Sequence, residues 1–144
     1  MKVRPILGIL MLLAVSAAAV RSQTPAPKPY KVVFDIGESG DAYFEKVVQK
    51  IANLSRDSRL QGKLDIRLVA HSPGIDFVAK AKNQPNAQSI EVLVRSGVKI
   101  EACNNSMVGH KLTKNDIFDG VQVVESGIGE IVLLQNQGFA YFKP

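Results

Sequence analysis

Short strand-like runs alternate with helix-like segments from Tyr30 to the end of the chain, and this alternation limits the folds open to it. Runs rich in β-branched and aromatic residues predict strands, whereas apolar residues three or four positions apart predict helices. Strands are expected at residues 30–36, 64–70, 98–102, 121–124 and 139–142, and helices at residues 41–56, 75–81, 86–95 and 128–136. This pattern is typical of an α/β fold with a mostly parallel sheet.

Two segments between the main elements are harder to assign, and two of the helices carry further signals. Residues 104–110 fit either a loop or a short helix, and residues 113–118 resemble a capped helical turn. Ser39 or Asp41 is expected to cap the helix at residues 41–56. The last helix is expected to use one side for its packing, with Ile128, Ile131, Val132 and Gln135 on that side.

Five strands in 144 residues predict a flavodoxin-like three-layer fold with the strand order 2-1-3-4-5. In that order the carboxyl ends of the first and third strands flank the point where ligands tend to bind. The loops there are residues 37–41 (GESGD) and residues 103–107 (CNNSM). The predicted sheet therefore brings Gly37 and Ser39 to the same edge as Cys103.

The amino-terminal segment has the features of an export signal. Lys2 and Arg4 precede an almost purely apolar run at residues 6–20, which predicts a secretory signal peptide over residues 1–20. The alternative is a transmembrane anchor, which usually needs about 20 apolar residues. Residues 21–29 contain three prolines and predict a flexible linker, so residues 30–144 form the expected domain. Export would make the mature protein periplasmic or secreted, without a stable membrane anchor.

Composition gives little support to several classes of function. The formal net charge of +5 includes Lys2 and Arg4, and the other basic residues are scattered among acids, so nucleic-acid binding is not indicated. The two histidines and one cysteine lie far apart without the spacing of metal ligands. We therefore expect neither a metal site nor a cofactor. The missing Ser-His-Asp elbow motif also disfavours a hydrolase.

Cys103 is the only cysteine, so the chain can form neither an internal disulfide nor a CxxC redox pair. In an exported protein, a lone cysteine is a reactive thiol, an intermolecular bridge or an inert buried residue. Its place after a strand favours the thiolate, because backbone N–H groups at a following helix would lower its pKa. Residue type alone favours the inert alternative, because free cysteine is among the most buried side chains.

The other candidate residues each have a structural alternative. His71, in the AHSPG turn, fits a base or hydrogen-bond donor beside a ligand, or a turn histidine bonded to backbone. Gly37 and Ser39 lie in a loop that could hold an anion at a helix amino terminus or form a plain turn. Asn104 and Asn105, with the backbone after Cys103, would hold an anionic ligand there.

Three segments together resemble the DsrE/DsrF-like family of small sulfur-relay proteins. They are residues 69–75 (VAHSPGI), residues 97–107 (GVKIEACNNSM) and residues 123–144 (VVESGIGEIVLLQNQGFAYFKP), and the resemblance covers residues 30–144. It implies a flavodoxin-like fold and homo-oligomers, commonly trimers or hexamers. In family members that transfer sulfur, a cysteine matching Cys103 carries a persulfide.

Two functions follow as hypotheses. The resemblance implies a sulfur carrier of the sulfurtransferase type that uses Cys103, with thiol or persulfide donor and acceptor proteins as partners. The alternative is a non-catalytic oligomeric module that binds a small anion or a partner protein, in which Cys103 only packs the core. The best-understood family members work in the cytoplasm, so export would separate this chain from their partners. The reactivity of Cys103 distinguishes the two hypotheses.

Overall fold

The computed structural model describes residues 28–144. The predicted signal peptide at residues 1–20, and residues 21–27 of the predicted linker, lie outside the described residues. Within the described part of the chain, no helix has the length and apolar character needed to cross a bilayer.

The domain is an α/β fold around one five-stranded sheet, as predicted. The strands are β1 (Tyr30–Ile36), β2 (Leu64–Ala70), β3 (Lys99–Cys103), β4 (Gln122–Val124) and β5 (Ala140–Phe142), and the α-helices are α1 (Asp41–Arg56), α2 (Ala87–Arg95), α3 (Asn104–Gly109) and α4 (Gly127–Asn136). The described residues also contain three short 3-10 helices: η1 (Ser72–Val78), η2 (Gln84–Asn86) and η3 (Lys114–Asp116). All neighbouring strands run parallel.

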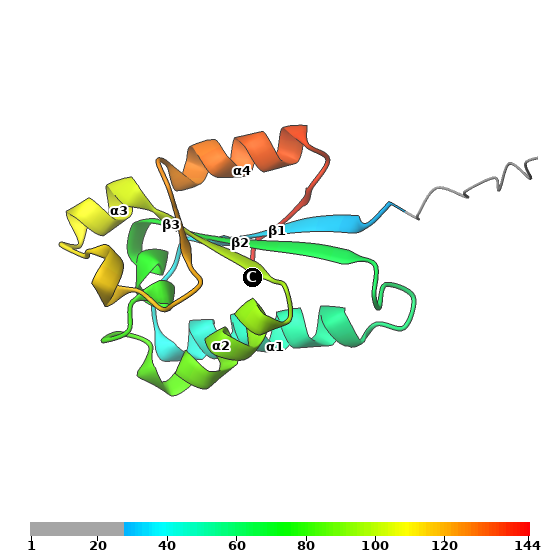
Figure 1. Cartoon of the computed structure of the whole chain (residues 1–144), viewed down its shortest axis with the longest axis horizontal. Coiled ribbons are helices and arrows are strands. Elements are labelled where there is room, and N and C mark those ends of the chain that lie inside the picture. The colour runs from blue at the N-terminus through cyan, green and yellow to red at the C-terminus, as the bar shows by residue number, and fades with distance from the viewer. Residues whose placement is uncertain (1–27) are drawn as a thin grey trace, which may run out of the picture.

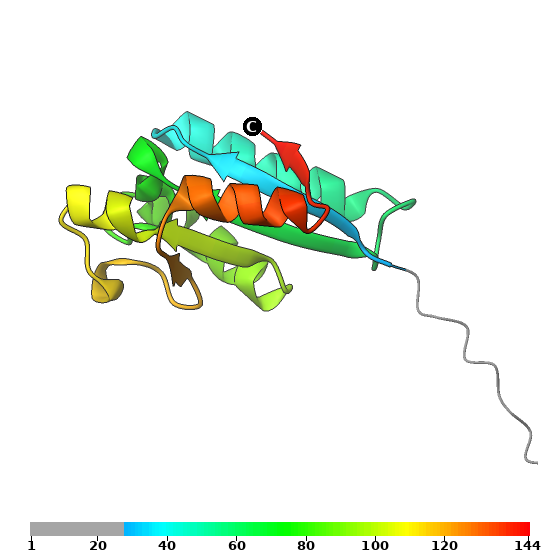
Figure 2. The same cartoon turned by 90° about the horizontal axis from the view of Figure 1, so that it is seen from above.

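The strand order is β4-β3-β2-β1-β5, so the predicted order 2-1-3-4-5 is wrong. The chain steps in one direction from β1 to β4, and α4 then carries it back across the sheet to β5 beside β1 (Figure 2). As a result β2 lies between β1 and β3. The turn after β2, which contains His71, therefore lies between the two loops that were predicted to flank the ligand.

Helices cover both faces of the sheet, which confirms the three-layer arrangement (Figure 1). On one face α1 and α2 pack against the larger apolar cluster, which includes Phe44, Leu68 and Ile90. The boundaries of α1 match the prediction because its apolar stripe is regular, with Phe44, Val47 and Ile51 buried. Burial of each such side chain stabilises the fold by roughly 1.5–3 kcal/mol.

The opposite face is covered by α4 over a smaller cluster of Val33, Val69, Ile131, Leu134 and Phe139. The predicted packing side of this helix is wrong in part. Ile131 is buried, but Ile128 and Val132 are 58% and 54% exposed. The helix is apolar nearly all round, so no single stripe marked the buried side.

The other departures are local. The helix predicted at residues 75–81 is the 3-10 helix η1, which begins three residues earlier and has Pro73 in its first turn. The ambiguous segment after Cys103 forms α3. The predicted capped turn is confirmed as η3, where Thr113 and Asp116 form a capping box.

Candidate functional site

Cys103 is the last residue of β3 and directly precedes α3. Its side chain is buried, with only 5% of the residue exposed, and its thiol is free. It belongs to neither of the two apolar clusters of the core. Cys103 is therefore buried, but outside the two main apolar clusters.

Four groups that can donate a hydrogen bond lie near the Cys103 sulfur. Burial by itself raises the pKa of the thiol, but the Ser106 hydroxyl and the backbone N–H groups of Gly127, Ser106 and Asn105 lower it further than burial raises it. The net effect is a pKa below the ordinary thiol value, because hydrogen bonds donated to the sulfur favour its charged form. The site therefore stabilises a thiolate.

The Ser106 hydroxyl is oriented by a second contact. Its Oγ accepts a hydrogen bond from the Ser72 backbone N–H at 2.7 Å, which leaves its proton to point toward Cys103. Ser106 was not among the predicted site residues. Its spacing was a usable signal, because a hydroxyl three residues after a helix N-cap faces that cap, as in a capping box. Here Cys103 is the N-cap of α3.

His71 directly follows β2 and forms hydrogen bonds with a second group of polar side chains near Cys103. Its Nε2 is 2.6 Å from Asp35 Oδ1, and its Nδ1 is 3.1 Å from Ser72 Oγ. Tyr141 on β5 donates its hydroxyl proton to Asp35 Oδ2 at 2.5 Å. Both ring nitrogens of His71 thus face side chains, whereas the turn interpretation expected backbone partners. Asp35 and Tyr141 lie within strands and carried no sequence signal.

Gly127 connects the polar groups around Cys103 with those around His71. A β-carbon at this position would lie 2.7 Å from His71 Cβ and 3.2 Å from Cys103 Cβ. The Gly127 backbone therefore packs directly against both residues, and only glycine fits there without displacement. Its N–H can approach the Cys103 sulfur for the same reason.

Of the two predicted site residues in the loop after β1, Gly37 lies beside His71 and Ser39 contacts Asp76 instead. Gly37 lies against the His71 ring, since a β-carbon there would be 3.2 Å from His71 Cε1. Ser39 does not cap α1, whose N-cap is Gly40; its hydroxyl donates instead to Asp76 Oδ2 at 2.9 Å.

Asn104 and Asn105 begin α3, and their side chains are exposed. The backbone N–H of Asn105 lies near the Cys103 sulfur and lowers the pKa of the thiol. The contribution of this segment to holding a negative charge therefore comes from the backbone and from Ser106 rather than from the two amides.

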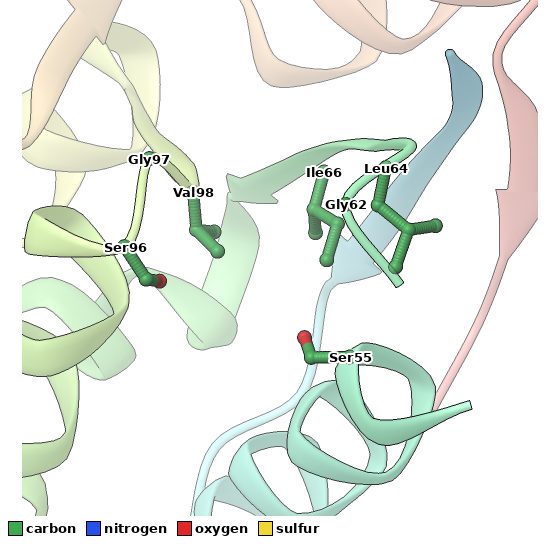
Figure 3. Close-up of a pocket in the computed structure, with 7 residues that line it drawn as sticks. All are labelled: Ser55, Gly62, Leu64, Ile66, Ser96, Gly97 and Val98. Carbon is green, nitrogen blue, oxygen red and sulfur yellow. The ribbon is translucent and has the colours of Figure 1, made fainter. Parts of the chain in front are cut away.

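A separate cavity of about 280 Å³ lies at the opposite edge of the sheet, near the start of β2 and β3 (Figure 3). It is lined by Ser55, Gly62, Leu64, Ile66, Ser96, Gly97 and Val98. None of these side chains titrates or ligates a metal strongly. Within residues 28–144, no group of three His, Cys, Asp or Glu side chains could hold a metal ion.

We expect Ser106→Ala to slow alkylation of Cys103 at pH 7 by about tenfold or more, because a hydrogen bond to a charged group contributes about 1.5–3 kcal/mol. The measurement is the rate of modification by iodoacetamide as a function of pH, which follows the thiolate fraction. The alkylation rates of Ser106→Ala and wild type should converge at alkaline pH, where the Cys103 thiol is ionised in both proteins. Ser106→Thr keeps the hydroxyl and serves as the control; equal rates for Ser106→Ala and wild type at pH 7 would contradict the assignment.

Comparisons with known proteins agree with this fold. Residues 18–144 match the DsrE/DsrF-like family. No curated protein matches the chain. A solved structure of a protein of unknown function from Methanobacterium thermoautotrophicum is 30% identical, with a TM-score of 0.72 over 80% of this chain and 99% of that chain. The chain belongs to the DsrE/DsrF-like family.

Proposed function

We propose that this protein is a sulfur carrier in which the Cys103 thiolate takes up sulfane sulfur as a persulfide and passes it to a thiol acceptor. The observation that carries the proposal is a buried thiol at the junction of β3 and α3, where the neighbouring polar groups can all donate a hydrogen bond to it. Membership of the DsrE/DsrF-like family supports chemistry of the sulfur-relay type. A sulfurtransferase-type protein needs a nucleophilic sulfur, and the thiolate is that nucleophile.

In the loading step, the Cys103 thiolate attacks the outer sulfur of a donor persulfide. The bond between the two donor sulfurs breaks, and the donor leaves as a thiolate. In the unloading step, an acceptor thiolate attacks the outer sulfur of the Cys103 persulfide and releases Cys103 as a thiolate. The donors around Cys103 stabilise the charge that it carries before loading and after unloading.

The second candidate is a non-catalytic module in which Cys103 only packs the core. Cys103 is only 5% exposed, which favours the non-catalytic module. The surroundings of Cys103 favour the carrier, because the residue lies outside both apolar clusters and near a hydroxyl and three backbone N–H groups.

The partners and compartment form part of the same proposal. Exposed apolar residues on the outer side of α4, namely Ile128, Val132 and Leu133, support contact between copies of the chain. A trimer or hexamer would bury this surface. With an export signal at residues 1–20, the thiol or persulfide donor and acceptor proteins would lie in the periplasm or outside the cell.

The test is to incubate the domain with a small-molecule persulfide donor and to measure its intact mass. We expect wild-type protein to gain one sulfur atom at Cys103, and Cys103→Ser to gain none while keeping its circular-dichroism spectrum and melting temperature. A thiol chase should then remove the added sulfur. An unmodified wild-type protein whose thiol also alkylates slowly at neutral pH would overturn the carrier and leave the binding module.

A further inference from the structure

The donors around Cys103 stabilise a negative charge, but unloading also requires a group that accepts a proton. An acceptor thiol must become a thiolate before it can attack the Cys103 persulfide. The three backbone N–H groups cannot take up that proton. The Ser106 oxygen already accepts a hydrogen bond from the Ser72 N–H. If the site itself takes up that proton, a titratable group must accept it.

His71 has the geometry of a proton acceptor. An ionised carboxylate only accepts hydrogen bonds, so the contact of 2.6 Å with Asp35 places a hydrogen on His71 Nε2. In its neutral form with the hydrogen on Nε2, His71 presents the lone pair of Nδ1 to the Ser72 hydroxyl at 3.1 Å. The resulting order of hydroxyl, imidazole and carboxylate is one in which a histidine base is oriented and its charged form stabilised.

The groups packed around His71 act as donors or as a fixed carboxylate. The hydrogen bond to Asp35 raises the pKa of Tyr141 above its ordinary value. Burial, followed by the charge of Glu38, raises the pKa of Tyr43 to about 12, and its hydroxyl lies 3.4 Å from the Asp35 carbonyl oxygen. Both phenols therefore remain protonated at neutral pH. Tyr141 holds Asp35 in place, and Asp35 holds His71.

Ser72 joins the imidazole to the surroundings of the thiolate. Its hydroxyl contacts His71, and its N–H contacts the Ser106 hydroxyl that donates to Cys103. Ser72 is exposed, whereas His71 and Cys103 are buried, so a thiol from outside reaches the Ser72 hydroxyl first. Its φ of 51° lies in the left-handed region, which is uncommon for a residue with a side chain and often marks a functional position.

We propose that His71, held by Asp35 and Tyr141, accepts the proton of the acceptor thiol through the Ser72 hydroxyl. This inference rests on the proposed sulfur-carrier function. The thiol gives its proton to Ser72 Oγ as the Ser72 proton moves to His71 Nδ1. The new thiolate attacks the outer sulfur of the Cys103 persulfide, and Cys103 leaves with the electron pair of the broken S–S bond. The acceptor is oxidised to a persulfide and the Cys103 sulfur is reduced, so no further oxidant is needed.

The test compares two acceptors in single-turnover unloading at pH 7. One is an alkyl thiol, which is largely protonated, and the other is an aromatic thiol, which is already ionised. His71→Gln keeps an amide donor toward Asp35 but cannot take up a proton. We expect this variant to unload to the alkyl thiol at least about 10²-fold more slowly than wild type, the usual effect of losing a general base. Unloading to the aromatic thiol should be unchanged.

Ser72→Ala provides a second route if His71→Gln fails to fold, because it removes the hydroxyl and keeps the backbone N–H. It should show the same selective loss toward the alkyl thiol. In both variants the iodoacetamide rate of Cys103 should match wild type, because its donors are intact. Equal slowing toward both acceptors, or no slowing toward either, would overturn the assignment to His71 while leaving the carrier intact. A wild-type protein that never loads sulfur would overturn both proposals.

Discussion

Replacing Arg67 with methionine should lower the free energy of unfolding by about 3–5 kcal/mol at neutral pH, because it leaves a buried carboxylate without its counter-ion. Arg67 Nη1 lies 2.8 Å from Glu101 Oε1, and the Glu101 side chain is only 3% exposed. The other carboxylate oxygen, Oε2, is buried and has no hydrogen-bond partner among residues 28–144. Arg67 is thus the main compensation for the Glu101 charge.

The sign of the pH dependence separates this cause from a simple loss of packing. Burial, followed by the charge of Glu130, raises the pKa of Glu101, and Arg67 opposes that rise. A carboxyl whose pKa is raised in the folded state contributes stability below its unfolded pKa and loses it as pH rises through the folded pKa. Without Arg67 the folded pKa rises further. The Arg67→Met deficit should therefore be smaller at about pH 5 than at about pH 7.5.

Urea unfolding at the two pH values measures this deficit. The control is the double variant Arg67→Met with Glu101→Leu, which replaces both charges by apolar groups and should recover most of the lost stability. A double variant as unstable as Arg67→Met would show that the ion pair is not the cause. A deficit independent of pH would point instead to the lost contact with the Phe139 ring, which lies 5.6 Å from the Arg67 guanidinium.

Gly74→Ala should destabilise the fold by at least about 3 kcal/mol, since the new side chain meets backbone that cannot move aside. A β-carbon at Gly74 would lie 2.0 Å from the Ile36 carbonyl oxygen and 2.9 Å from the Gly37 nitrogen. The same carbonyl accepts a hydrogen bond from the His71 N–H at 3.0 Å. Any displacement of Ile36 therefore also moves His71. The melting temperature should fall by about 10 °C or more.

Gly109→Ala is the matched control, because a β-carbon at the end of α3 meets nothing within 4 Å. Alanine favours a helix over glycine by up to about 1 kcal/mol, so this variant should be as stable as wild type or slightly more so. Thermal unfolding of both variants under the same conditions makes the comparison. If Gly74→Ala and Gly109→Ala have the same melting temperature, then η1 and the end of β1 do not pack as closely as the structure shows.

The positions of most strands and helices could be predicted, because each is encoded by a pattern of residues within its own segment. The runs at residues 30–36 and 64–70 gave β1 and β2 with correct boundaries, and the regular stripe of Phe44, Val47 and Ile51 gave α1. The strand order was not readable, because it depends on where the connections after β2 and β4 place β3 and β5 rather than on which residues form strands. The packing side of α4 was hidden for a related reason: Ile128 and Ile131 are equally apolar, and only the tertiary structure makes one exposed and the other buried.

In the candidate site, too, locally encoded features could be predicted and long-range contacts could not. The position of Cys103 at the end of a strand and the start of a helix could be predicted, since both elements are encoded nearby in the sequence. The contact between His71 and Asp35 joins residues 36 positions apart, and that between Tyr141 and Asp35 joins residues 106 apart. No local pattern encodes such pairs. They follow from β1 lying between β2 and β5 in the parallel register.

The all-donor environment of Cys103 also sets how firmly the proposed carrier would hold its cargo. A persulfide moves the negative charge to an outer sulfur about 2.05 Å beyond the one that Ser106 and the backbone N–H groups contact. Those donors therefore stabilise the empty thiolate more than the loaded form. Stabilising the reduced form of a thiol makes its oxidised form a better oxidant. The equilibrium for sulfur would then favour release, and a protein with this site would act as a relay that gives sulfur away rather than as a store that retains it.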